Sequence, residues 1–457
     1  MSRRLAGGAH LLALWERLRT SYWFVPTLMT TGAVALSFAS VHLDGQVNAK
    51  WVRTVGWIWA GSPEGAREVL STIAGSMITV AGVAFSITIV ALTLASTQFG
   101  PRLLRNFVRD LGNQVVLGTF VSTFVYCLLV LRTVRGGDRT EFVPYVSVTL
   151  GVAFALTSLG VLIYFIHHVA TAIQADSLIA SVADELEEAI EEMFPERLGG
   201  PGPELERPEE ARDAAMEGEG LAIASRHSGY IQGLDVEELM EIACEEDLLL
   251  RLSRSPGRFV AAGGTLAHAF ASGRAARVGD AAAGRIRSAF ILGRRRTPTQ
   301  DPEYAVHQLV EIAVRALSPS VNDPFTTMTC LDWLGTALSE LAGRKVPSPF
   351  RYDGQGRLRV IAEGPDFGGM ADAAFNQIRQ YGSGSVSVIL RLLDTIAAVG
   401  ERVRRPQDRA CLRLHADKAV QDARAVLVNE GDRREVEERH AATLRVLGEA
   451  AGPPPAA

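Results

Sequence analysis

One uncharged segment constrains the fold of this chain more than any other feature. Between Glu68 and Arg102 lie 33 residues without a single ionisable side chain. A helix rises about 1.5 Å per residue, so this segment as a helix would exceed the roughly 30 Å hydrocarbon core of a bilayer. The segment therefore predicts a helix that crosses a membrane and extends beyond it.

Three further segments are long enough and apolar enough to cross a bilayer as helices. They are residues 24–43, 111–131 and 142–175, and each lacks Asp, Glu, Lys and Arg. Together with the long span they predict an α-helical integral membrane protein with four transmembrane helices in residues 1–175.

Basic residues and cysteines bear on the orientation of these spans. Seven basic residues precede the first span or join the second to the third, against six on the other side, and the positive-inside rule assigns the seven to the cytoplasm. Cys244, Cys330 and Cys411 follow the spans without the spacing of a disulfide or metal framework, which fits a reducing cytosol. We therefore expect a multi-pass plasma membrane protein with both termini in the cytoplasm.

The rest of the chain is divided by its composition. Residues 176–220 predict a stalk helix followed by an acidic linker rich in Pro, Gly and Glu. Residues 221–274 alternate short apolar runs with turn residues, and predict a small β-rich module. Residues 275–450 predict a mainly helical cytoplasmic domain, ahead of a disordered tail at 451–457. The fold class is thus four transmembrane helices plus a mixed α/β C-terminal cytoplasmic region.

The long span carries a polar stripe along one side. At about 100° per residue, six hydroxyl residues fall within an arc of roughly 100°, and two valines interrupt them. This hydroxyl stripe consists of Thr72, Ser76, Thr79, Val83, Ser86, Val90, Thr93 and Thr97. A helix surrounded by lipid has no use for such a face, so we expect the stripe to contact protein or water.

Two interpretations of the hydroxyl stripe remain open, and they are compatible. In a homo-oligomeric channel the hydroxyls would line a watery path and the two valines would narrow it. Alternatively, small residues at four-residue spacing, such as Gly75 and Thr79, would let helices pack closely. A helix break at Gly100 and Pro101, followed by a cationic mouth that concentrates anions, favours the pore. That cytoplasmic mouth consists of Gln98, Arg102, Arg105 and Arg109.

Signatures of catalysis and of cofactor binding are missing from the sequence. It has no H-E-x-x-H, no G-x-S-x-G and no cysteine–histidine spacing suited to zinc. The net charge of −5 and the lack of a basic stripe give no reason to expect nucleic acid. The sequence thus predicts neither an enzyme nor a bound cofactor or metal. Because no Asp, Glu, Lys or Arg lies within a span, passive conduction or no transport is favoured over coupled transport.

The densest polar group of the soluble part falls between residues 294 and 323. Its candidate ligand-binding members are Arg296, Gln300, Asp301, Arg315, Asn322 and Asp323. Asp301 and Asp323 each precede a proline and are expected to begin helices, whose N-termini, together with the arginines, would bind a small anion or metabolite. The alternative is that both aspartates only cap their helices, while the arginines pair with stalk glutamates or anionic lipid.

Five motifs, one in the second span, one at its end and three in the soluble part, are long enough to be specific. They are residues 71–83 (STIAGSMITVAGV), 98–104 (QFGPRLL), 228–232 (SGYIQ), 296–302 (RTPTQDP) and 315–324 (RALSPSVNDP). Over nearly the whole chain these motifs resemble a family of bacterial predicted membrane proteins, the domain of unknown function 2254. The resemblance implies bacterial origin and four spans with a soluble C-terminal region, and it implies no known activity. The expected location is thus the bacterial plasma (inner) membrane.

The sequence as a whole predicts a homo-oligomeric ion channel or pore that leans towards anions. The second transmembrane helix would line the path, and the cytoplasmic region would gate it. Expected partners are the lipid bilayer, further copies of the chain and a small anion or metabolite. The alternative is a membrane-anchored ligand sensor or scaffold without transport, in which the hydroxyl stripe serves only helix packing.

Overall fold

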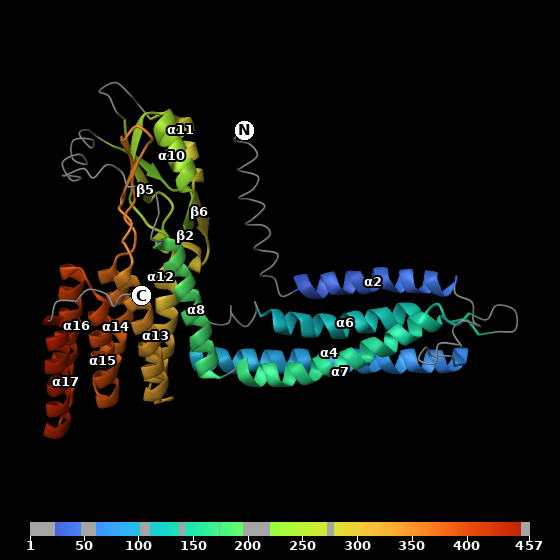
Figure 1. Ribbon diagram of the computed structural model, residues 1–457. Helices are drawn as coiled ribbons and strands as arrows, with labels where there is room; N and C mark the ends of the chain where they lie inside the picture. Colours follow the sequence, from blue (N-terminus) through green and yellow to red (C-terminus); the bar gives the residue numbers. More distant parts are fainter. Residues whose placement is uncertain are drawn as a thin grey trace, which may run out of the picture. The chain divides into compact units, whose positions relative to one another are not determined.

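The computed structural model divides the chain into two units, Met1–Ser177 and Leu178–Ala457. The residues that it describes are 23–46, 61–100, 110–136, 142–172, 174–194, 220–271 and 278–448. The first unit is built from long helices, and the second combines helices with two β-sheets (Figure 1). The predicted tail at 451–457 and nearly all of the predicted acidic linker lie outside the described residues.

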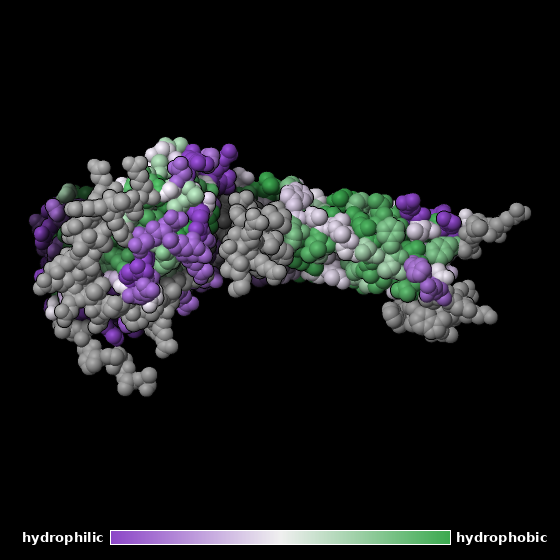
Figure 2. Space-filling model, turned by 90° about the horizontal axis from the view of Figure 1, so that it is seen from above, coloured by the Kyte–Doolittle hydropathy of each residue, from purple (hydrophilic) through white to green (hydrophobic). Residues whose placement is uncertain are grey.

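Four helices of the first unit are long and apolar enough to cross a membrane. They are α2 (Phe24–Asp44), α4 (Pro63–Phe99), α6 (Leu111–Leu131) and α7 (Tyr145–Ala172). Their surface is mostly hydrophobic, as the green area of Figure 2 shows. The predicted fold class, four transmembrane helices followed by a mixed α/β region, is confirmed. At 37 residues, α4 is the longest of the four helices, and at about 1.5 Å per residue it exceeds the hydrocarbon thickness.

The helix α6 is the centre of the first unit, since it packs against α2, α4 and α7. The side of α4 that is buried in this unit carries a row of alanines. This alanine row consists of Ala66, Ala74, Ala81, Ala84, Ala91 and Ala95. Ala74 clusters with Tyr126, and Ala81 and Ala84 cluster with Phe120 of α6. Small side chains let two helices approach closely, which is the usual way that helices associate within a membrane.

A buried carboxylate joins α2 to α7 at one end of the first unit. Asp44, the last residue of α2, accepts hydrogen bonds from the backbone N–H groups of Val146 (2.8 Å) and Ser147 (2.9 Å) and from the Ser147 hydroxyl (2.6 Å). It therefore satisfies N–H groups that the first turn of α7 leaves without helical partners. The Tyr126 hydroxyl, which lies 3.0 Å from that of Ser40, donates to the Ser147 carbonyl and ties in α6 as well.

An aspartate–histidine pair joins α6 to α7 at the other end. Asp110 precedes α6 and accepts hydrogen bonds from the Gly112 N–H (2.8 Å) and the Asn113 side chain (3.2 Å). The same carboxylate contacts Nε2 of His168 on α7, and the imidazole stacks on the Tyr164 ring at a centroid distance of 5.3 Å. The first unit is thus fastened at both ends by polar contacts between helices distant in sequence.

Two sheets form the β part of the second unit. The strands are β1 (Leu221–Ala224), β2 (Gly229–Leu234), β3 (Leu248–Leu252), β4 (Phe259–Val260), β5 (Thr265–Ala271), β6 (Phe290–Gly293), β7 (Phe350–Tyr352) and β8 (Leu358–Ile361). One sheet has the order β1-β5-β3-β8-β7 and the other β4-β2-β6, and only the β3–β8 pair is parallel. The sheets therefore include strands from beyond residues 221–274, where the sequence placed the β-rich module. The helices α10 (Val236–Glu245) and α11 (Asp280–Ser288) share their core.

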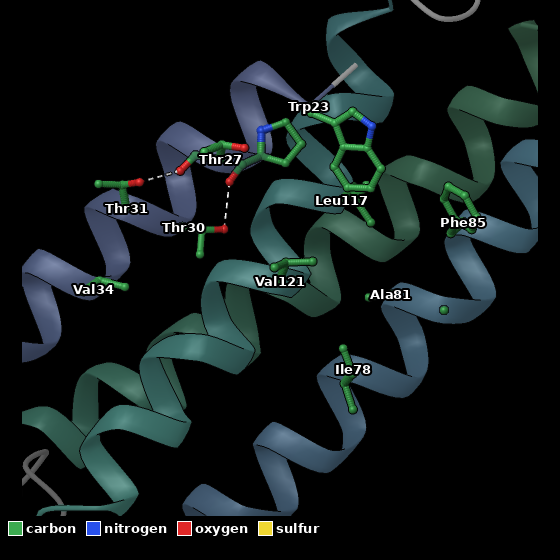
Figure 3. A pocket seen from close by; sticks show the side chains of 12 residues that line it. Trp23, Thr27, Thr30, Thr31, Val34, Ile78, Ala81, Phe85, Leu117 and Val121 are labelled. Atoms are coloured by element: carbon green, nitrogen blue, oxygen red, sulfur yellow. Dashed lines mark hydrogen bonds between the residues drawn. The ribbon is translucent and has the colours of Figure 1, made fainter. Parts of the chain in front are cut away.

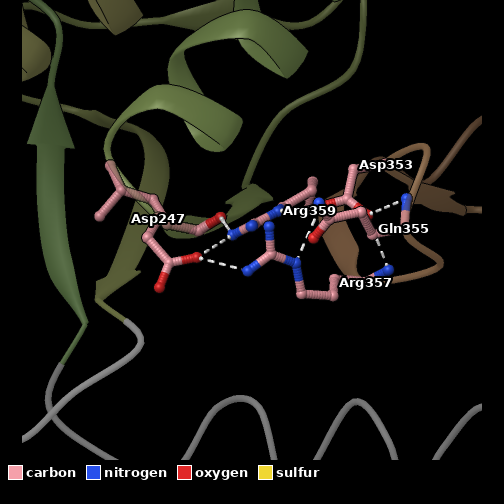
Figure 4. Close-up of polar contacts among 6 residues, drawn as sticks. Asp247, Asp353, Gln355, Arg357 and Arg359 are labelled. Atoms are coloured by element: carbon pink, nitrogen blue, oxygen red, sulfur yellow. Dashed lines mark hydrogen bonds and ion pairs between the residues drawn. The ribbon is translucent and has the colours of Figure 1, made fainter.

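A buried arginine links β8 to the segment before β3, its parallel neighbour in the sheet (Figure 4). Arg359 of β8 is only 2% exposed. Its Nη1 lies 2.7 Å from the Asp247 carboxylate, which precedes β3, and its Nε lies 2.9 Å from the carboxylate of Asp353 in the β7–β8 turn. Hydrogen bonds from the Arg357 and Gln355 backbone and from both arginines hold the pKa of the Asp353 carboxyl well below its usual range. The Arg359 guanidinium thus links two carboxylates from segments that lie about 100 residues apart in the sequence.

The remaining helices of the second unit form a bundle. They are α12 (Pro302–Ala316), α13 (Pro324–Gly343), α14 (Phe367–Gly382), α15 (Val386–Arg402), α16 (Pro406–Val426) and α17 (Glu430–Gly448), with the short 3₁₀ helix η1 (Pro298–Gln300) before α12. The helix α8 (Ala175–Met193) begins three residues after α7 ends, and its residues from Leu178 onward belong to this unit. Arg344 of the bundle donates to the Phe194 carbonyl (3.2 Å), so the predicted stalk is held against the bundle.

A buried histidine makes the second unit sensitive to acid. His415 of α16 is 1% exposed, and its ring packs edge-on against Phe375. Burial lowers the pKa of this imidazole to about 4, although Asp372 opposes the shift and Lys418 and Arg379 add to it. An unfolded histidine has a pKa near 6.5, so the unfolded chain binds the proton first as the pH falls.

We therefore expect the stabilisation from neutral His415 to be complete above about pH 6.5 and lost as the pH falls to about 4, by roughly 2 to 3 kcal/mol. Thermal unfolding of the detergent-solubilised chain over this pH range measures the loss. His415→Gln should flatten the dependence, whereas replacing the exposed His227 by Gln should leave it as in the wild type. An equally steep dependence in His415→Gln would assign the acid sensitivity to other groups.

Candidate functional site

The hydroxyl stripe lies on the outer surface of α4. All eight of its residues are exposed in the protomer, including both valines. The alanine row is buried on another side of the helix and makes the contacts with α6. Close packing within the protomer is therefore the task of the alanines, and the hydroxyl stripe is left for whatever surrounds the first unit.

Two glycines beside the stripe are equally uncovered. A Cβ atom built at Gly75 or Gly82 meets no other atom within 4 Å. By contrast, a Cβ at Gly118 of α6 would lie 2.5 Å from the Met29 sulfur of α2. Gly118 is thus required by packing inside the first unit, whereas the two glycines of α4 are not. Their small size bears only on contacts outside the protomer.

Most stripe hydroxyls donate to their own helix backbone. The four bonds, each 2.9 Å long, run from Thr79 to the Gly75 carbonyl, from Ser86 to Gly82, from Thr93 to Ile89 and from Thr97 to Leu94. A hydroxyl bonded in this way keeps an oxygen lone pair that faces outward as an acceptor. The exposed face of α7 differs, since it is dominated by large apolar side chains such as Leu156, Leu159 and Ile163. This face of α7 is therefore typical of contact with lipid.

A groove of about 650 Å³ runs beside the stripe between α2 and α4 (Figure 3). Thr27, Thr31 and Val34 line it from α2, Ile78 and Phe85 from α4, and Leu117 and Val121 from α6. The hydroxyls of Thr30 and Thr31 donate to the carbonyls of Pro26 and Thr27 one turn earlier, so the groove walls are largely apolar. Gly82 lies at the border between this groove and the hydroxyl stripe.

The predicted cytoplasmic mouth can be placed only in part. The helix α4 ends at Phe99, and Gly100 follows with φ +114, a conformation that favours glycine, as expected for a break at this point. Arg102, Arg105 and Arg109 lie outside the described residues, and so does the side chain of Gln98. The cationic mouth stays a prediction.

The structure does not bring the six candidate ligand-binding residues together. Arg296, Gln300 and Asp301 lie at the start of α12, whereas Arg315, Asn322 and Asp323 lie at or after its end. A helix of 15 residues is about 22 Å long. One small anion or metabolite therefore cannot contact both groups.

The first group forms a structural clamp. Asp301 is 3% exposed and accepts hydrogen bonds from Nε (2.8 Å) and Nη2 (2.9 Å) of Arg296, and it does not cap α12. Burial raises the pKa of the Asp301 carboxyl, and the Arg296 guanidinium opposes that rise. Gln300 pairs with the backbone of Leu234, accepting from its N–H at 2.9 Å and donating to its carbonyl at 3.4 Å. The segment thus joins β2 to α12. Asp301 stands at the N-cap position of α12, as expected, but its side chain makes no capping hydrogen bond.

The second group contains a true helix cap. Asp323 accepts hydrogen bonds from the N–H groups of Phe325 (3.1 Å) and Thr326 (3.2 Å) and from the Thr326 hydroxyl (2.6 Å). The Thr326 hydroxyl, followed by these N–H groups, lowers the pKa of the Asp323 carboxyl. Asn322 adopts φ +49, a left-handed conformation that asparagine tolerates in turns. For Asp323, the capping interpretation therefore accounts for the contacts.

Sequence reasoning missed the polar contacts that fasten the first unit. Asp110 precedes a span directly, so its position carried a signal for N-capping, whereas Asp44 ends a span and matches no local capping rule. Their partners Ser147 and His168 are distant in sequence and could not be read from it. Among the described residues, no group of three or more His, Cys, Asp and Glu side chains could hold a metal ion.

Comparisons with known proteins agree with this architecture. The family model described as "Predicted membrane protein (DUF2254)" matches residues 19–398. The uncharacterized proteins Mb1321c of Mycobacterium bovis and Rv1290c of Mycobacterium tuberculosis are each 32% identical over 424 residues, which cover 92% of this chain and 80% of theirs. No solved structure matches the chain. A bacterial membrane fits these relatives, while the inner membrane and the orientation of the termini stay predictions. The chain therefore belongs to the family of predicted membrane proteins called domain of unknown function 2254.

Proposed function

We propose that this chain forms a homo-oligomeric membrane pore in which α4 of each copy turns its hydroxyl stripe towards a shared axis. One observation carries this proposal: the alanine row does the packing inside the protomer, and the hydroxyl stripe remains uncovered. A row of hydroxyl oxygens gains from contact with water, whereas contact with lipid offers it no partner. An axis formed by several copies supplies that water.

The chemistry of the stripe suits passive conduction. Residues 69–97 contain no charged side chain, so an ion would be stabilised by hydroxyl dipoles alone. Val83 and Val90 are seven residues apart, which places their rings about 10 Å apart along the path. Such apolar rings close a pore by excluding water. A preference for anions would arise from the arginines that follow Gly100, and gating would fall to the second unit.

Water access to the stripe is the first test. We expect Ser86→Cys to react with a membrane-impermeant thiol reagent at least about ten times faster than Thr157→Cys, because the reactive thiolate forms in water and not in lipid. The two positions are matched, since each hydroxyl is exposed and donates to a carbonyl four residues earlier at 2.9 Å. The measurement uses proteoliposomes and a Cys244→Ser background, because Cys244 is exposed.

Ion flux from the same proteoliposomes is the second test. Val83→Ser should raise flux by removing part of an apolar ring, and Ile163→Ser on the exposed face of α7 should not. Equal reactivity of the two cysteines together with absent flux would refute the pore. The alternative, a membrane-anchored sensor or scaffold whose stripe only packs against another helix, would then be the better proposal.

A further inference from the structure

Three turns of the helical bundle meet at one of its ends. Residues 317–323 join α12 to α13, 383–385 join α14 to α15, and 427–429 join α16 to α17. A Cβ at Gly382 would lie 3.4 Å from Leu317, and one at Gly384 would lie 3.6 Å from Val426, so the middle turn touches both neighbours. This end of the bundle includes the motif around Asp323, which the pore proposal does not explain.

Large apolar side chains are exposed at this end. We call them the apolar tip: Val321, Phe325, Tyr381, Val426 and Val428. Phe325 is 74% and Val428 88% exposed. Apolar side chains gathered in this way on a water-soluble domain mark a contact surface.

The chain enters the second unit at the same end. Arg344, which follows α13, holds the C-terminal end of α8 through the Phe194 carbonyl (3.2 Å) and the Glu191 carboxylate (3.4 Å). The buried row of α8, from Leu178 to Ile190, runs nearly its whole length, and Figure 1 draws this helix along α12 and α13. The start of α8 therefore lies towards the start of α13, where Phe325 is exposed. Because α8 begins three residues after α7 ends, the link between them spans at most about 10 Å.

From these observations we propose that the apolar tip docks on the surface of the lipid bilayer. Because that link is short, the start of α8 cannot lie far from the end of the membrane-spanning helix α7. Phe325 and Tyr381 are aromatic residues of the kind that concentrate at membrane interfaces. Charges beside the tip are of both signs, as with Glu430, Asp432 and Arg433. Apolar contact therefore drives the docking, and anionic lipid is not required.

Quenching by labelled lipid tests this proposal on the full chain. Phe325→Cys and Leu414→Cys are each labelled with an environment-sensitive dye in a Cys244→Ser background and reconstituted into phosphatidylcholine liposomes. Leu414 is the matched control, because it is an exposed apolar residue in the middle of α16, away from the tip. With lipid that carries a doxyl group near the headgroup, we expect more than half of the fluorescence at position 325 to be lost and that at position 414 to be retained.

Two results would overturn the docking proposal. One is a signal at position 325 that the doxyl lipid leaves unchanged. The other is loss of that signal by self-quenching between labelled copies, with no effect of doxyl lipid, which would assign the tip to contact with a second copy. Quenching that appears only after phosphatidylglycerol is added would show that anionic lipid drives the contact, against the apolar mechanism. Since no flux is measured, these outcomes are independent of the pore proposal.

Discussion

Replacing Arg359 by methionine is expected to destabilise the second unit by about 3 kcal/mol, the cost of removing one partner of a buried ion pair. Methionine keeps most of the side-chain bulk, so the change isolates the loss of charge. Without the guanidinium, the carboxylate of Asp353 loses a hydrogen bond of 2.9 Å and that of Asp247 loses one of 2.7 Å. The parallel strands β3 and β8 then lose the ion pairs that link their ends.

Arg357→Met is the matched control for this change. Arg357 contacts the same two carboxylates, but its side chain is 54% exposed. An exposed ion pair contributes less than about 1 kcal/mol. Thermal unfolding of the detergent-solubilised chain should therefore show a melting temperature roughly 5 to 10 °C lower for Arg359→Met and a much smaller change for Arg357→Met. Equal shifts of the melting temperature in the two variants would show that the burial of Arg359 does not increase its contribution to stability.

Replacing Gly257 by alanine is expected to destabilise the same unit by about 3 kcal/mol or more, from backbone strain and steric overlap together. Gly257 adopts φ +83, and a Cβ there would lie 2.2 Å from Oδ2 of Asp301. Asp301 cannot yield easily, because it is buried and bonded twice to Arg296. The substitution therefore forces apart the clamp that joins β2 to α12.

Gly263→Ala separates the two contributions to this effect. Gly263 has nearly the same backbone angle, φ +84, but a Cβ there meets no atom within 4 Å. It should lose only the strain of a left-handed conformation, about 1 to 2 kcal/mol. The difference between the two melting temperatures measures the contribution of steric overlap to the destabilisation. If Gly257→Ala and Gly263→Ala unfold at the same temperature, the close contact with Asp301 contributes nothing to the destabilisation.

The elements with a local signal were predicted well. The four spans follow from hydropathy alone, and the helix starts at Pro302 and Pro324 follow from proline preceded by aspartate. The break after Phe99 follows from Gly100 and Pro101. Each of these features depends on a few adjacent residues, so no knowledge of distant contacts was needed.

The arrangement of the candidate ligand-binding residues could not be predicted from local sequence. Asp301 and Asp323 stand in the same local context, each directly before a proline. Only Asp323 caps its helix, because Asp301 meets Arg296 and the close backbone of Gly257 instead. Proximity in sequence also suggested one constellation, yet α12 holds its two halves at opposite ends. Which aspartate caps and which is clamped was decided by the surrounding fold.

By itself, the sequence determined that residues 24–172 include four membrane-spanning helices, because a bilayer tests each segment for length and polarity independently of the others. Only the tertiary structure decided which side of α4 packs inside the protomer. Periodicity gives that helix a small, apolar side and a hydroxyl side, and both suit close packing. The contacts of Ala81 and Ala84 with Phe120 of α6 resolve the choice and leave Ser86 exposed. The contacts of Asp44 with Ser147 and of Arg359 with Asp247 likewise arise only when segments more than 100 residues apart in the sequence meet.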